Sequence, residues 1–257
     1  GVNDPEALVV HARMLRQPGR DAVLRTLDEA AVRHAAGGEI EIFKQADFVA
    51  FLGADEAVVE AAAAAAAEHA QWDKAPNIEP IQQEAAWLRG QPSDDRQYGA
   101  EEDLEAPGEI VEATFSRPYI AHASLAPSCA LAQFTDGRLT LWSHGQGMHP
   151  LRRNIAEVLQ LPIEAISAKH LNGPGCYGHN GADDVTLDAA IIAMNRPGRC
   201  IRLQWRREEE FAFEPFGPAM LVDLKVRIDD AGRPADWTTE VWSPTHVQRP
   251  GTGSGFL

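Results

Sequence analysis

The chain has 257 residues, of which 44% are hydrophobic, so it can bury the core of one large domain or of two ordinary ones. Its formal net charge of -15 argues against nucleic acid or an anionic membrane surface as a partner, because both require a basic face on the protein. Three scattered cysteines without a CxxC pair argue against a disulfide framework, a cysteine-held iron–sulfur cluster and a structural zinc site.

The first part of the chain predicts alternating helices and strands, as in an α/β domain. A helix is expected to run from Asp21, a good N-cap residue, to Ala35, because its leucines and alanines recur on one face. An alanine-rich segment, 55–72, predicts a longer helix, since alanine has the highest helix propensity. The other elements expected here are short: strands at 39–44 and 47–54, and a helix at 80–90 with Pro80 in its first turn.

The stretch 93–109 is acidic, contains few large apolar residues and ends near a Pro-Gly pair. This composition predicts a linker that divides the chain into domains at 1–92 and 110–257. A solvated acidic loop inside a single domain is the alternative.

The second part of the chain predicts mostly strands, with two helices among them. Alternating apolar residues predict strands at 109–116, 129–135, 138–143, 163–171, 200–206, 219–229 and 235–243. Asp136-Gly137 predicts a tight turn between the second and third of these strands, and the last two are expected to form a hairpin. The helices are expected at 150–161 and at 184–195, the second capped by Asp183 or Asp184.

The segment from Gly173 to Asp184 reads GPGCYGHNGADD and lies between an expected strand and the start of a helix. Unpaired backbone N–H groups gather at such a place, and glycine leaves the main chain open to close approach. These residues therefore predict that backbone amides hold an oxygen-rich or anionic group. The spacing matches neither a P-loop nor the dinucleotide-binding GxGxxG. A purely structural glycine turn is the alternative.

A second loop of the same kind, WSHGQGMH, begins at Trp142 and also joins a strand to a helix. Its Gln146 can both donate and accept hydrogen bonds, which suits an oxo group or the edge of a pterin. The histidine pairs 144/149 and 170/179 lack the spacing of a zinc hydrolase, so no metal ligands are predicted in this chain.

The stretches WSHGQG, GPGCYGHNGADD and IRLQWRREEEF occur in the order and spacing of the molybdenum hydroxylase large subunit. The chain thus resembles the xanthine dehydrogenase and aldehyde oxidase family, and within it the branch of isoquinoline 1-oxidoreductase β subunits and nicotinate dehydrogenase-like subunits. The segments HARMLRQP and DFVAFLGADEAVVEAAAAAAAEHAQW are similar to that family's α/β-hammerhead domain. The resemblance implies an α+β fold: a hammerhead domain, then part of a molybdopterin-binding domain with a mixed or antiparallel sheet.

The resemblance also implies roles for individual residues. Gln146 takes the place of a glutamine beside the molybdenum oxo group. In the family, a Gly-Gly-Phe-Gly turn contacts the cofactor. Its place is taken here by Gly175, Cys176, Tyr177 and Gly178, so a cysteine replaces the second glycine and a tyrosine replaces the phenylalanine. His179 and Asn180 stand where other branches shape the substrate pocket, which leaves the substrate open. The RREEEF segment is interpreted as a structural turn with a solvated charge run.

In the family, the cofactor oxidatively hydroxylates an N-heteroaromatic or aldehyde substrate with water as the oxygen source, and electrons leave through an iron–sulfur small subunit. The family's glutamate base lies downstream, in a second cofactor-binding half, and no residue here takes its place. We therefore expect a fragment that lacks its C-terminal half, contains no catalytic residue, holds no molybdopterin when isolated, and is inactive alone.

Two other interpretations stay open. One is a non-catalytic module that binds the pterin or assembles subunits. The other is a hydrolase that uses His179 or Cys176 with a nearby aspartate, which requires a base within hydrogen-bond reach of the nucleophile. No membrane span or signal peptide is visible, and the compartment, cytoplasmic or periplasmic, is left open.

Overall fold

The computed structural model describes residues 9–19, 22–74, 85–99 and 107–244. The chain folds into two compact units, and both are assembled from separated segments. Unit 1 comprises Gly1–Asn77, His122–Pro215 and Val247–Leu257, and unit 2 comprises Ile78–Ala121 and Phe216–His246. The predicted division into 1–92 and 110–257 remains a prediction, and we note that strands from both stretches share the main sheet of unit 1.

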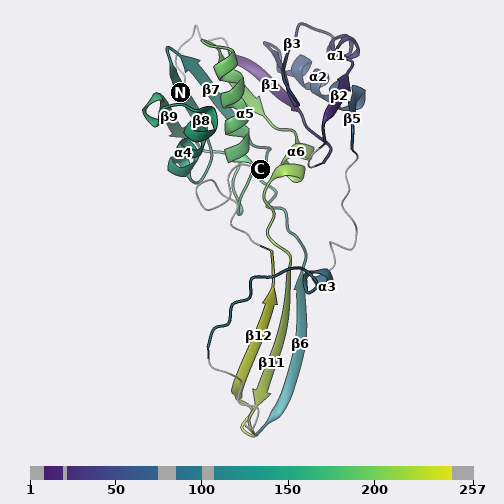
Figure 1. Ribbon diagram of the computed structural model, residues 1–257, viewed down its shortest axis with the longest axis vertical. Coiled ribbons are helices and arrows are strands. Elements are labelled where there is room, and N and C mark those ends of the chain that lie inside the picture. Colours follow the sequence, from purple (N-terminus) through teal and green to yellow (C-terminus); the bar gives the residue numbers. More distant parts are fainter. Residues whose placement is uncertain (1–8, 20–21, 75–84, 100–106, 245–257) are drawn as a thin grey trace. The chain divides into compact units, whose positions relative to one another are not determined.

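Unit 1 is organised around a seven-stranded sheet (Figure 1). From one edge to the other its strands are β3 (Glu41–Gln45), β4 (Phe48–Gly53), β1 (Val9–Leu15), β10 (Cys200–Gln204), β7 (Cys129–Thr135), β8 (Arg138–Ser143) and β9 (Ile166–His170). The pairs β1–β10 and β8–β9 are parallel, and the other neighbours are antiparallel. This mixed sheet, together with its helices, confirms the predicted α+β class.

Helices cover both faces of this sheet. In β4, Val49 and Phe51 pack in one core with α1 (Glu29–Ala36) and α2 (Glu56–His69). The intervening Ala50 and Leu52 belong to the other core, with α4 (Met148–Leu159) and α5 (Ala182–Asn195). Because successive side chains of a strand point to opposite faces, the two helical layers lie on opposite sides of the sheet.

The prediction of a helix starting at Asp21 was wrong. Residues Leu24–Leu27 form strand β2, which pairs with β5 (Ala70–Trp72), and helix α1 starts only after Asp28, whose carboxylate accepts the Ala31 N–H at 2.9 Å. The alanine-rich helix likewise ends at His69, three residues early, because β5 occupies the rest. Strand pairing between distant segments outweighed the local helical pattern here. Pro80 lies outside the described residues.

Unit 2 contains a three-stranded antiparallel sheet of β12 (Pro234–Trp242), β11 (Met220–Ile228) and β6 (Glu109–Arg117), drawn in Figure 1. The predicted hairpin of the last two strands is confirmed. A small core of Leu88, Ala219 and Leu221 joins this sheet to the short helix α3 (Ala85–Leu88). Among the described helices of the chain, none is long and apolar enough to cross a membrane.

Two strand-to-helix loops leave the same edge of the main sheet. Strands β8 and β9 are parallel neighbours, so their carboxyl ends meet at one edge. The first loop, 144–147, leads into α4, and the second, 171–181, leads into α5. The sheet topology therefore positions the two loops singled out by the sequence side by side.

Candidate cofactor-binding site

The two loops are in direct contact through His144 and Asn180. The Nδ2 atom of Asn180 lies 3.3 Å from Nδ1 of His144, and both side chains are buried. A Cβ placed on Gly173 would lie 2.5 Å from the His144 ring, so the glycine loop runs directly over this histidine. The predicted juxtaposition of the glutamine loop and the glycine loop is therefore present in the fold.

Asn180 closes the second loop onto itself. Its Nδ2 donates to the Gly175 carbonyl at 3.3 Å, and its Oδ1 accepts the Ala182 N–H at 3.2 Å. Only 2% of the residue is exposed, so the amide is occupied by partners within the chain. The predicted contribution of Asn180 to a substrate pocket stays a prediction, and what the structure shows is an internal tie of the loop.

Both helices that follow the loops begin without a side-chain cap. The N-cap residues are Gly147 for α4 and Gly181 for α5, and neither start has a side-chain cap hydrogen bond. The prediction that Asp183 or Asp184 caps α5 was wrong, because the helix begins at Ala182 and both aspartates lie inside its first turn. Asp183 Oδ2 instead lies 3.2 Å from Nε2 of His179.

The glycines of the second loop face rings of the chain itself. A Cβ on Gly178 would lie 2.0 Å from the His122 ring, one on Gly181 would lie 2.1 Å from Trp205, and one on Gly175 would lie 2.7 Å from the Tyr177 hydroxyl. These close approaches account for glycine at each position without a ligand. The side of the main chain that glycine leaves open is thus packed, which favours the structural interpretation of these particular residues.

Gln146 is a predicted site residue that remains available. Its side chain is exposed and makes no hydrogen bond with any described residue. It directly precedes Gly147, where the uncapped N–H groups of α4 begin. An exposed amide beside uncapped backbone donors fits an oxygen-rich, anionic group such as a pterin phosphate or a metal oxo group. Tyr177, which is 59% exposed, is the open side chain of the other loop.

Burial governs the electrostatics around His144. Desolvation lowers the pKa of His144 from its ordinary value, although the carboxylates of Glu210 and Asp183 act in the opposite direction. Its Nε2 accepts the Cys129 N–H at 3.3 Å. A neutral imidazole held in this way is a rigid support for the loops.

Cys176 and His179 do not form a nucleophile–base pair. The Cys176 thiol donates to the Gly178 carbonyl at 3.3 Å, and the hydrogen-bonding partner of His179 is Asp183. A cysteine hydrolase needs the thiol bonded to its base. The geometry therefore offers no support for Cys176 as a nucleophile, and a hydrolase that uses His179 with Asp183 stays a prediction.

Sequence analysis missed the role of Glu210, which was interpreted as part of a solvated charge run. The segment is structural, as predicted, but the prediction that its charges are solvated was wrong for two of the three glutamates: Glu210 lies in α6 (Arg207–Phe213) with 0% exposure, and Glu209 is 2% exposed. Glu210 accepts three hydrogen bonds, from the Ser128 N–H at 2.7 Å, the Ser128 hydroxyl at 3.0 Å and the Gly181 N–H at 3.1 Å. The available signal was Phe213, three residues later on the same helical face, which packs against the main core.

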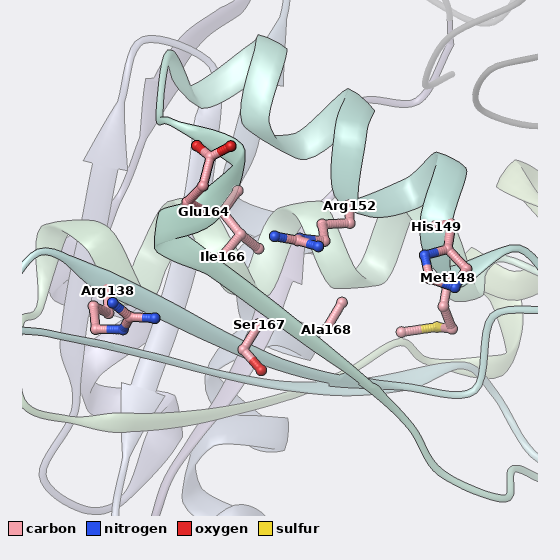
Figure 2. Close-up of a pocket in the computed structure, with 8 residues that line it drawn as sticks. All are labelled: Arg138, Met148, His149, Arg152, Glu164, Ile166, Ser167 and Ala168. Carbon is pink, nitrogen blue, oxygen red and sulfur yellow. The ribbon is translucent and has the colours of Figure 1, made fainter.

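Other features of the described residues lie apart from the two loops. Figure 2 shows a cavity beside α4 and β9, and neither Gln146 nor the glycine loop lines it. Among the described residues, no group of three or more His, Cys, Asp or Glu side chains could hold a metal ion.

The family of this chain follows from its similarity to known proteins. The molybdopterin cofactor-binding domain family matches residues 86–245. The chain is 32% identical over 259 residues to a nicotinate dehydrogenase subunit of Pseudomonas putida, covering 93% of this chain and 21% of that protein. It is 26% identical to the molybdenum-binding subunit of an aldehyde oxidoreductase of Escherichia coli, covering 52% of this chain and 18% of that protein. The chain thus spans about a fifth of the length of these curated relatives.

Solved structures show the same fold. Quinoline 2-oxidoreductase from Pseudomonas putida 86 superposes with a TM-score of 0.65 at 17% identity, covering 91% of this chain and 35% of that one. CO dehydrogenase from Oligotropha carboxidovorans superposes with a TM-score of 0.63 at 16% identity, covering 91% and 36%. Together with the two contacting loops and the match over residues 86–245, these likenesses confirm the resemblance: the chain belongs to the molybdopterin cofactor-binding domain family of the molybdenum hydroxylases.

Proposed function

We propose that this chain forms part of the large subunit of a molybdenum hydroxylase and supplies about half of its molybdopterin cradle. The observation that carries this proposal is the exposed amide of Gln146, which has no partner among the described residues, beside the uncapped start of α4 and at the loop that contacts 173–181. When bound, the cofactor would supply oxidative hydroxylation of an electron-poor carbon with oxygen from water.

Each group near the loops then has a definite task. Gln146 would bind and orient the polar edge of the cofactor, and the first-turn amides of α4 would hold anionic oxygen. The buried pair His144 and Asn180 would keep the two loops at a fixed separation. Cys176 and Tyr177 would lie at the cofactor surface, and His179 would face the substrate.

The activity of the whole protein would require further parts. The resemblance assigns the base to a downstream glutamate, so we place the base in a second half of the cradle outside this chain. An iron–sulfur subunit would accept the electrons. The names of the two relatives, nicotinate dehydrogenase and aldehyde oxidoreductase, favour an N-heteroaromatic or aldehyde substrate for the complete enzyme.

Binding of added molybdopterin to the purified chain, which is expected to carry none as isolated, tests the role of Gln146. We expect Gln146→Ala to weaken molybdopterin binding about two- to tenfold, the loss of one neutral hydrogen bond, as measured by pterin fluorescence. Gln45→Ala is the matched control, because the Gln45 side chain is also exposed and makes no side-chain hydrogen bond with any described residue. Equal affinities of the two variants would remove Gln146 from the site.

Turnover tests the rest of the proposal. The chain supplied with the cofactor is expected to show no oxidation of nicotinate or of an aromatic aldehyde. Robust turnover would overturn the assignment of the base to a second half. Binding without turnover even in the presence of that half would instead favour a non-catalytic assembly module.

A further inference from the structure

The cavity in Figure 2 has a volume of about 350 Å³ and lies where α4 passes the edge strand β9. Its lining combines apolar and cationic side chains. Met148, Ile166 and Ala168 provide the apolar part, and Arg138 and Arg152 provide two guanidinium groups. This volume is at the lower end of the range of small-molecule sites, so it suits a small organic molecule.

The arginines of this cavity have unused donors. Arg152 donates from Nη2 to the Ile163 carbonyl at 2.6 Å, but its Nε–H is buried without a partner. Arg138 is exposed, and its guanidinium makes no hydrogen bond or ion pair with any residue that the structure describes. Buried N–H groups are nearly always satisfied, so the orphaned Nε points to a missing acceptor.

The single carboxylate of the lining does not supply that acceptor. Glu164 forms no ion pair with Arg138 or Arg152 within the described residues, and in Figure 2 its carboxylate points away from the Arg152 guanidinium. In a chain of net charge -15, a cavity lined by two arginines and one glutamate is locally cationic. The local charge thus favours an anion.

We propose that this cavity binds a small organic anion whose carboxylate or phosphate pairs with the guanidinium groups of Arg152 and Arg138, which both line it. Guanidinium groups match these anions geometrically and form charge-assisted hydrogen bonds with them. The apolar lining would contact the remainder of the ligand. Because neither Gln146 nor the glycine loop lines the cavity, this site is independent of the proposed cofactor function.

Titration of the purified chain tests the site, with benzoate as the carboxylate probe and inorganic phosphate as the phosphate probe, at ionic strength held constant with sodium chloride. We expect saturable binding of at least one probe by calorimetry. Arg152→Gln should weaken binding about tenfold or more, and Arg138→Gln, which removes an exposed charge, about three- to tenfold. Glu164→Gln should tighten binding, because it removes the opposing charge.

Arg153→Gln is the matched control, because Arg153 lies on the same helix, is exposed, and its guanidinium makes no hydrogen bond or ion pair with a described residue. It should bind like the unmodified chain. Arg152→Gln also removes the hydrogen bond to the Ile163 carbonyl. If that variant fails to fold, the affinities of Arg138→Gln and Glu164→Gln test the site in its place. No saturable binding of either probe, or equal affinities for Arg138→Gln, Glu164→Gln and Arg153→Gln, would refute the site.

Discussion

Replacing Glu210 with glutamine should destabilise the chain strongly, although the change is nearly isosteric. The carboxylate is 0% exposed and accepts three hydrogen bonds, two from Ser128 and one from the backbone of Gly181. A glutamine has one oxygen where glutamate has two, so its NH₂ group would face at least one of these donors. Gly181 is the N-cap of α5, so the loss would act on the glycine loop as well as on α6.

The magnitude follows from those contacts. Leaving one buried donor unsatisfied costs roughly 1–3 kcal/mol, and the remaining bonds lose their charge assistance at roughly 0.5–1 kcal/mol each. Removing a buried charge offsets part of this cost, so we expect a net loss of about 2–4 kcal/mol in the free energy of unfolding. For a chain of this size, that loss corresponds to a fall of roughly 4–16 °C in Tm.

Urea unfolding followed by circular dichroism measures this loss, with coincident fluorescence curves as the check for two-state behaviour. The control is Glu208→Gln, because Glu208 lies on the same helix and is exposed. It should change stability by less than about 0.5 kcal/mol. If the two variants unfold at the same urea concentration, Glu210 is not the anchor that its contacts indicate.

Three further outcomes are expected. Gly181→Ala should destabilise the chain by about 1–3 kcal/mol more than Gly147→Ala in urea unfolding. Both residues are N-cap glycines with negative φ, but only a Cβ on Gly181 would enter the Trp205 ring. Similar losses of stability in the two variants would refute this packing. Burial lowers the pKa of His144, so the unfolded chain binds the proton more readily than the folded chain. The free energy of unfolding should therefore fall as pH drops below about 6.5. His144→Gln should make the free energy of unfolding less dependent on pH in this range. Hydrogen bonds from Arg13 and Arg202 lower the pKa of Glu56 to about 2. The stabilising contribution of the Glu56 carboxylate should therefore be complete above about pH 4.5 and lost as pH falls toward 2. An unchanged acid unfolding transition in Glu56→Gln would contradict this expectation.

Local patterns in the sequence were sufficient for most elements of the fold. The strands at 129–135 and 138–143 match β7 and β8, and their turn was readable because Asp136-Gly137 tolerates positive φ at both positions, observed at 51° and 74°. The alanine-rich helix was predicted from propensity alone. The failure at Leu24–Leu27 has a physical cause, since β5, which pairs with this strand, lies more than forty residues away in the chain.

The amino-acid sequence by itself determined which loops carry the candidate site and which family the chain resembles, because loop motifs and spacing are local properties. Only the tertiary structure decided how the glycines are used and where the charges lie. The parallel pairing of β1 with β10, which brings Val9 opposite Cys200, and the burial of Glu210 against Ser128 both depend on contacts between segments far apart in the chain. Neither hydrophobic periodicity nor residue type specifies such contacts, since both describe a residue relative to its near neighbours only.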